Sequence, residues 1–149
     1  IMTEPEGPAW RQTIFYPFLH ASRYGHGSVL DVQVRSPVYA NPEFDAVPLL
    51  EAIATIDDER EMVAVFAVNR SQDEALPLEG DLRALEGYRV VEHLVLTHVD
   101  PDAKNSAAAP ETVTPHAGGD ASLDAGRLAA TLAPLSWNVI RLARGVGNG

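Results

Sequence analysis

The sequence predicts a mainly β fold, an antiparallel sandwich or barrel, preceded by one strand–loop–helix unit. Two observations support this prediction. After residue 25 the 149-residue chain consists of short stretches rich in β-branched residues, separated by turn signals and without a long helical pattern between them. Before residue 25 a short apolar piece runs through a Glu/Pro/Gly loop into an aromatic-rich helical pattern, as at the end of a parallel α/β unit. Strands of this kind usually close in a Greek-key or jelly-roll arrangement.

The helical pattern spans residues 10–24. Its large apolar side chains recur at the spacing of one helical face, at Trp10, Ile14, Phe15, Phe18 and Leu19. Pro17 lies inside this pattern and opposes a regular helix, because an interior proline removes a backbone hydrogen bond. A glycine on each side of His26 supplies the stop signal. We therefore expect one helix over residues 10–24.

The strands follow in order along the rest of the chain. In residues 28–35, Leu30, Val32 and Val34 alternate with polar residues, which predicts a half-buried strand. Residues 61–69 form a near-continuous apolar run and are the strongest strand signal in the chain. Further strands are expected at 49–57, 75–80, 88–97, 127–132 and 136–142.

Three connections carry their own predictions. Residues 36–45 contain two prolines and are expected to form an irregular loop with Tyr39 and Phe44 as aromatic anchors. Residues 57–60 make a charged turn, expected to be a solvated hairpin tip. Residues 101–126 are rich in Ala, Pro, Gly and Asp, and we expect a long loop there with one short strand near 111–114.

Composition excludes several classes of function. The formal net charge is −10, ten of the eleven basic residues are scattered arginines, and Lys104 is the only lysine. A surface that follows phosphates needs clustered basic residues, so neither nucleic acid nor an anionic membrane is an expected partner. Cysteine is absent, which fits a reducing compartment, and we expect a cytoplasmic protein.

Few residues point to catalysis. The five histidines have no metal-ligand spacing and are interpreted as scattered surface residues, so no metal and no cofactor are expected. The serines lie in neither a nucleophile-elbow motif nor a catalytic-triad pattern, so no nucleophilic serine is expected. A glycosidase needs two carboxylates across the sugar, and no catalytic pair stands out among the candidates, which are Glu4, Glu6, Asp31, Glu51 and the 57–59 turn.

Gln12 is the one polar residue that the pattern places at a binding position. It is expected in the first turn of the helix that follows the N-terminal loop. A side-chain amide both donates and accepts hydrogen bonds, as recognition of sugar hydroxyls requires. The alternative is an ordinary polar helix residue, and the pattern alone favours that alternative.

Several motifs resemble the C-terminal region of glycoside hydrolase family 51 α-L-arabinofuranosidases. The segment Met2-Thr3-Glu4 followed by Ala9-Trp10-Arg11-Gln12-Thr13-Ile14-Phe15-Tyr16-Pro17-Phe18 resembles the end of that family's catalytic barrel. Residues 105–115 and 135–142 resemble a late loop and the final strand. The resemblance implies a jelly-roll antiparallel β-sandwich at residues 25–149, preceded at residues 1–24 by the last strand–loop–helix of a (β/α)8 barrel.

The resemblance also implies an activity. Members of the family hydrolyse terminal non-reducing α-L-arabinofuranosyl residues with retention, using two glutamates on earlier barrel strands. The Asn-Glu acid/base motif does not occur in this sequence, so the catalytic glutamates are expected upstream and the chain alone is expected to be inactive. Gln12 resembles the residue that contacts arabinose at the barrel mouth. The implied partners are the upstream barrel, L-arabinofuranosyl oligosaccharides and further copies in a homo-oligomer.

A barrel helix without its barrel would expose its apolar stripe unless it packs on something else. We therefore expect either a preceding catalytic segment or packing of this helix against the sandwich. Two other functions remain open. One is a stand-alone carbohydrate-binding sandwich, for which Tyr39, Phe44, Tyr88 and Trp137 are the available aromatics, with Trp137 expected in the core. The other is a structural domain that supports the barrel and the oligomer.

Overall fold

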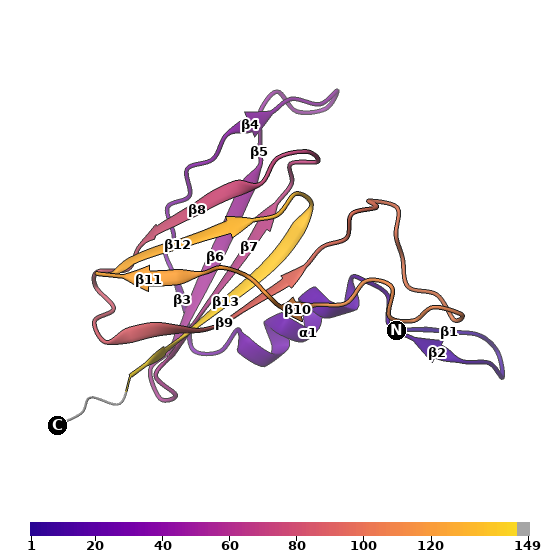
Figure 1. Ribbon diagram of the computed structural model, residues 1–149, viewed down its shortest axis with the longest axis horizontal. Helices are drawn as coiled ribbons and strands as arrows, with labels where there is room; N and C mark the ends of the chain where they lie inside the picture. Colours follow the sequence, from indigo (N-terminus) through magenta and orange to yellow (C-terminus); the bar gives the residue numbers. More distant parts are fainter. Residues whose placement is uncertain (146–149) are drawn as a thin grey trace.

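A six-stranded antiparallel sheet forms the centre of the computed structural model, which describes residues 1–145 (Figure 1). Its strand order is β10-β9-β13-β7-β6-β3. Strands distant in sequence lie side by side, since β13 pairs with both β7 and β9. The bounds are β3 Ser28–Leu30, β6 Leu50–Asp57, β7 Met62–Asn69, β9 Tyr88–Leu96, β10 His116–Ala117 and β13 Ser136–Arg144.

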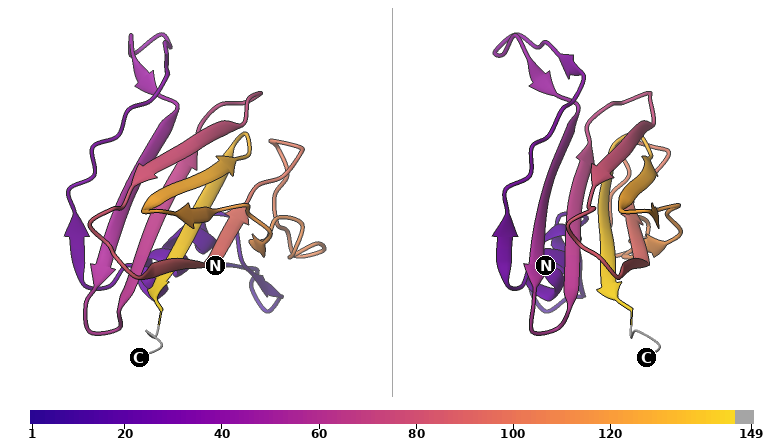
Figure 2. Two further views of the ribbon diagram at one scale, coloured as in Figure 1. Left: turned by 60° about the vertical axis from the view of Figure 1, so that its left-hand side comes forward. Right: turned by 90° about the vertical axis from the view of Figure 1, so that its left-hand side faces the viewer.

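A smaller three-stranded sheet covers one face of this large sheet (Figure 2). Its order is β11-β12-β8, with β11 at Ser122–Asp124, β12 at Arg127–Leu132 and β8 at Leu76–Asp81. The main core lies between the two sheets and includes Leu132 and Leu142, both fully buried. The predicted antiparallel β-sandwich is therefore confirmed.

The large sheet is buried on both faces along β7, which explains the unbroken apolar run in the sequence. Val63 and Val65 belong to the core between the sheets. Ala64 and Phe66 alternate with them and belong to a second cluster on the outer face, together with Val139. Tyr24 and Trp137 pack against this second cluster.

The helix α1 covers part of that outer face (Figure 2). It spans Phe15–Tyr24 and is the one α-helix of the described residues. Its start corrects the expected 10–24, because Trp10 belongs to β2 (Ala9–Trp10), which pairs with β1 (Met2–Thr3) in a separate antiparallel ribbon. With this start, Pro17 lies in the first turn, where an N–H has no helical partner, so the proline removes no hydrogen bond from the helix.

The buried face of α1 also differs from the expected stripe. Tyr16 and His20 are its buried residues, four positions apart. Ile14 and Phe18 are exposed, at 68% and 72%. The helix therefore packs against the sandwich with its Tyr16 face and leaves an apolar face to solvent.

The segment after β3 corrects a second expectation. The strand ends at Leu30, and Val32 and Val34 are exposed rather than half-buried. The following residues form a projecting ribbon of β4 (Val38–Tyr39) and β5 (Val47–Pro48) (Figure 1). Tyr39 and Phe44 of this ribbon are exposed, which corrects their expected role as aromatic anchors.

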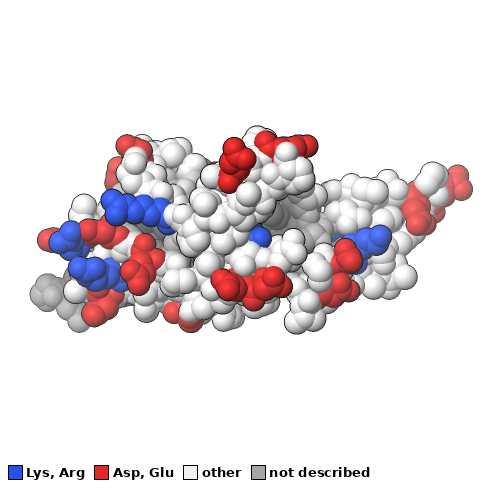
Figure 3. Space-filling model, turned by 90° about the horizontal axis from the view of Figure 1, so that it is seen from above, with Lys and Arg blue, Asp and Glu red and all other residues white. Residues whose placement is uncertain are grey.

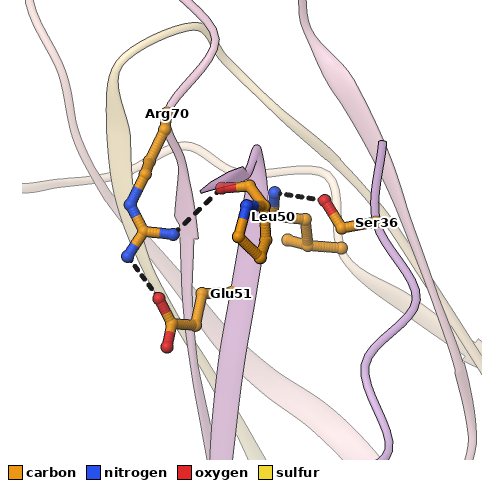
Figure 4. Close-up of polar contacts among 5 residues, drawn as sticks. Ser36, Leu50, Glu51 and Arg70 are labelled. Carbon is orange, nitrogen blue, oxygen red and sulfur yellow. Dashed lines mark hydrogen bonds and ion pairs between the residues drawn. The ribbon is translucent and has the colours of Figure 1, made fainter. Parts of the chain in front are cut away.

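Polar contacts fasten this segment to the start of β6 (Figure 4). The Leu50 N–H donates to Ser36 Oγ at 2.7 Å. Arg70 donates to the Pro48 carbonyl at 3.1 Å and forms an ion pair with Glu51. These bonds fix both sides of the base of the β4–β5 ribbon.

The long connection after β9 holds two short strands, β10 and β11, and neither lies at the expected 111–114. Val113 is instead a buried core residue in an irregular loop. The other expected strands are confirmed within one to two residues of their ends. Within residues 1–145, no helix is long and apolar enough to cross a membrane.

Acidic side chains are spread over the face shown in Figure 3, and basic ones lie next to them rather than in a continuous patch. This distribution agrees with the net charge of −10. It gives this face no basic track for phosphates.

Candidate functional site

Gln12 lies between the β1–β2 ribbon and α1, in the short link that follows Trp10. It precedes the helix rather than occupying its first turn, and its side chain is half-buried. Its backbone carbonyl accepts the Phe15 N–H at 2.9 Å, and the Thr13 carbonyl accepts the Tyr16 N–H at 3.2 Å. These two bonds join the link to the start of α1.

A buried side chain 94 residues further along the chain holds the same link. Asn105 is 1% exposed and donates from Nδ2 to the Arg11 carbonyl at 2.9 Å. It also donates to the Val113 carbonyl at 3.0 Å and accepts the Val113 N–H at 2.7 Å. Asn105 begins the 105–115 motif, but its bond to Arg11, 94 residues away, could not be predicted from that local pattern.

Apolar packing completes the attachment. Tyr16, Leu96 and Val113 form a buried cluster in which Phe15 and Leu19 also pack. Beside this cluster a surface pocket of about 320 Å³ is lined by Thr13, Trp137 and the residues that follow β9. The link that carries Gln12 therefore lies against the sandwich rather than in open solvent.

The C-terminal half of α1 is fixed by polar groups. Trp137 Nε1 donates to His20 Nδ1 at 3.1 Å. Arg141 lies over the Tyr24 ring at 4.3 Å and pairs with Glu92 at 2.7 Å. Burial lowers the pKa of His20, Glu92 opposes this shift, and Arg23 adds to it.

The candidate carboxylates lie apart from one another. Glu4 and Glu6 are exposed in the turn between β1 and β2. Glu51 and Asp57 lie at opposite ends of β6 and each pairs with an arginine. Hydrogen bonds from Arg60 lower the pKa of Asp57, which is buried rather than a solvated tip residue. Each of these two carboxylates has a structural partner, and the described residues do not bring them together as a pair.

The histidines differ from the expected surface residues in two cases. His20 and His93 are both 5% exposed. The Nε2 atom of His93 lies 3.1 Å from Oδ1 of Asn138. Its Nδ1 atom accepts a hydrogen bond from the Ala121 N–H at 3.2 Å. Both are satisfied core histidines. Among residues 1–145, no group of three or more His, Cys, Asp or Glu is arranged to hold a metal ion.

The aromatic candidates for sugar stacking are also separated. Trp137 packs on Phe66 with ring centroids 5.8 Å apart beneath α1, so it serves the core of the outer face. Tyr88 is half-buried, with the Arg144 guanidinium 5.3 Å from its ring centroid. Only Tyr39 and Phe44 of the four candidates are exposed.

Comparison with known proteins identifies this arrangement. A family model described as the α-L-arabinofuranosidase C-terminal domain matches residues 1–136. The chain is 56% identical over 96% of its length to an intracellular exo-α-(1→5)-L-arabinofuranosidase of Streptomyces lividans, and covers 22% of that protein. It is 53% identical over 97% of its length to the protein of the same name from Halalkalibacterium halodurans, and covers 28% of it.

A solved structure supports the same relationship. A family 51 α-L-arabinofuranosidase from Bifidobacterium longum superposes with a TM-score of 0.84 at 33% identity, over 93% of this chain and 27% of that one. This chain thus spans about a quarter of the length of such relatives. The family-model match over residues 1–136 includes the Gln12 link, α1 and the sandwich strands up to the start of β13. The resemblance seen in the sequence is confirmed, and the chain belongs to the family of α-L-arabinofuranosidase C-terminal domains.

Proposed function

We propose that this chain is the C-terminal part of a longer, intracellular α-L-arabinofuranosidase that releases terminal non-reducing α-L-arabinofuranosyl residues with retention. The observation that carries the proposal is the continuous family match over residues 1–136, shared with relatives named as intracellular exo-acting arabinofuranosidases. In this proposal residues 1–24 complete the catalytic barrel and residues 25–149 form the sandwich domain.

The catalytic chemistry belongs to the proposed barrel. Retention requires two carboxyl groups about 5–5.5 Å apart, one as nucleophile and one as acid/base. The carboxylates at the two ends of β6 are engaged by arginines in this chain, which supports a source for the catalytic pair outside these residues. The chain alone is then inactive.

The exposed face of α1 supports a barrel that packs beside it. Ile14 and Phe18 are 68% and 72% exposed on the side away from the sandwich. In addition, Trp10 Nε1 is buried and lacks a hydrogen-bond partner among the described residues. Exposed apolar side chains and an unpaired buried donor both cost free energy, and a neighbouring barrel would reduce these costs.

Gln12 is the proposed sugar contact. It lies in the link immediately before α1, the side of a β/α unit from which barrel enzymes build their active sites. Its amide would donate to one sugar hydroxyl and accept from another. Arg11 and Thr13 hold the link by backbone bonds, so the Gln12 side chain remains available for substrate.

The test uses the full-length protein and 4-nitrophenyl α-L-arabinofuranoside. We expect the full-length protein to release 4-nitrophenolate and the 149-residue chain to release none. Gln12→Ala should lower kcat/KM by roughly tenfold to a hundredfold, because it removes hydrogen bonds to the sugar. Gln33→Ala is the matched control, since Gln33 is exposed and bonds only to Asp31 among the described residues. A full-length protein without arabinofuranosidase activity would refute the proposal.

A homo-oligomer is the proposed assembly. The projecting β4–β5 ribbon exposes Val38, Tyr39 and Phe44, which suits a contact between subunits (Figure 1). Light scattering coupled to size exclusion should give a multiple of the subunit mass for the full-length protein and a smaller assembly for Phe44→Ser. An unchanged mass for Phe44→Ser would exclude the ribbon as the contact.

Carbohydrate binding by the sandwich itself is the second candidate, supported by the same exposed pair, Tyr39 and Phe44. Isothermal titration of the chain with arabino-oligosaccharides separates the two ideas. Binding in the millimolar range or tighter that is lost in Tyr39→Ala would show that the ribbon binds sugar. Absence of heat would exclude sugar binding by the ribbon and leave subunit contact as its proposed role.

A further inference from the structure

Asn105 connects the sandwich to the link that carries Gln12. It lies in the loop between β9 and β10, and its side chain is almost completely buried at 1% exposure. All three of its side-chain hydrogen bonds go to backbone atoms, two to Val113 and one to the Arg11 carbonyl. A buried amide with this pattern fixes the relative position of two backbone segments.

We propose that Asn105 is a positioning residue that sets the orientation of Gln12 at the sugar site, an inference that rests on the proposed function. The Arg11 carbonyl belongs to the peptide group that ends at the Gln12 nitrogen, so the bond from Asn105 Nδ2 fixes the plane of that peptide. On the other side, the Gln12 carbonyl is fixed by the Phe15 N–H at 2.9 Å. The backbone of Gln12 is therefore held at both of its peptide groups.

The two anchors come from different parts of the molecule. One belongs to α1, which is adjacent in sequence, and the other belongs to the β9–β10 loop of the sandwich. The loop is itself attached through Val113, which packs with Tyr16 of α1 in one buried cluster. The sandwich thus contributes to sugar recognition without touching the sugar, because it limits the positions that the Gln12 side chain can reach.

The substitution that tests this is Asn105→Asp in the full-length protein. The aspartate keeps an acceptor for the Val113 N–H, but it replaces the Nδ2 donor by an oxygen that faces the Arg11 and Val113 carbonyls. The matched control is Asn69→Asp. Asn69 is also 1% exposed and its Nδ2 also donates only to carbonyls, those of Glu74, Leu132 and Ala133, none of which belongs to the link that carries Gln12.

We expect Asn105→Asp to lower kcat/KM toward 4-nitrophenyl α-L-arabinofuranoside by roughly tenfold or more, with a rise in KM like that of Gln12→Ala. Asn69→Asp should leave kcat/KM of the folded enzyme within about twofold of the wild type. In the Gln12→Ala background, Asn105→Asp should cause less than about a twofold further loss, because the residue it positions is already absent.

The outcomes are distinct. If the Asn105→Asp effect is the same with and without Gln12, or if kcat/KM is unchanged, Asn105 does not act through Gln12. If the aspartate variant does not fold, Asn105→Ser, which retains one short donor, is measured in the same cycle and must show the same non-additivity. A wild-type enzyme that is inactive on the arabinoside overturns the proposed function as well, whereas an active enzyme with additive losses overturns only the positioning role.

Discussion

Trp137 donates a hydrogen bond from Nε1 to Nδ1 of His20, 117 residues earlier, at 3.1 Å. The bond joins the last strand of the large sheet to the middle of α1, and both residues lie on the outer face of the sandwich. The helix is therefore attached to the sheet by a specific polar contact as well as by the Tyr16 cluster.

Trp137→Phe should destabilise the protein by about 1–3 kcal/mol, because it leaves the buried His20 acceptor unpaired. The matched control is Trp10→Phe, because Trp10 Nε1 is buried without a partner among the described residues. In the 149-residue chain, without the proposed barrel, that substitution removes an unpaired donor and should be neutral or stabilising. Urea unfolding followed by circular dichroism measures both, and equal losses in the two variants would contradict the role of the bond.

The His20 contact should make stability depend on pH. Burial holds the pKa of His20 below its ordinary 6.5, so the unfolded chain takes up a proton that the folded protein does not. Neutral His20 in the folded protein costs no extra free energy above pH 6.5, where the unfolded chain is neutral at this residue as well. As the pH falls from 6.5 toward the lower pKa of the folded state, protonation of the unfolded chain lowers the free energy of unfolding. Compared with His20→Gln, which accepts the same bond without titrating, the wild type should lose stability over that range. A constant difference between the two proteins from pH 8 to 5, roughly the range over which histidines titrate, would argue against it.

Gly27→Ala should be far more destabilising than Gly87→Ala. Both glycines have a left-handed backbone, with φ of 79° and 80°. At Gly87 an added methyl group would meet only Arg144 Cγ, at 3.6 Å, so the cost should be the backbone strain of about 1–2 kcal/mol. At Gly27 the methyl group would lie 2.0 Å from the Ile56 carbonyl oxygen in β6, so the β3–β6 pairing must shift. Thermal unfolding of the two variants compares them directly, and similar melting temperatures would be inconsistent with the close approach of Gly27 to β6.

Ile140→Ala should cost about 2–5 kcal/mol, because Ile140 is fully buried between the two sheets and the substitution leaves a cavity. Ile53→Ala in the same large sheet should cost less than about 1 kcal/mol, because Ile53 is 49% exposed. Chemical denaturation of the pair tests which face of the sheet carries the core. A larger loss of stability for Ile53→Ala than for Ile140→Ala would contradict a main core between the two sheets.

The sequence by itself determined the class of fold and most of its strands. The unbroken apolar run at β7 and the alternation in β12 depend on residues that are neighbours in the chain, so periodicity shows them directly. The Gln12 motif could likewise be found from the sequence, because its signal is a contiguous stretch of residues.

Only the tertiary structure decided where α1 begins and which face it buries. Ala9 and Trp10 pair with β1, and this pairing outweighs the helical spacing of Trp10 with Ile14. The exposure of Val32 and Val34 was likewise not predictable, since alternation shows that a segment has two faces but not that a second sheet covers one of them.

The same holds for the attachment of the candidate site. Asn105 and Arg11 are 94 residues apart and His20 and Trp137 are 117 apart, so no local pattern records either contact. Strand and helix propensities are set by neighbouring residues, whereas a buried hydrogen bond forms only when the whole chain has brought its donor and acceptor together. The sequence singled out Gln12 as the proposed sugar contact through its resemblance motif, and the folded chain supplied the anchors that hold its backbone.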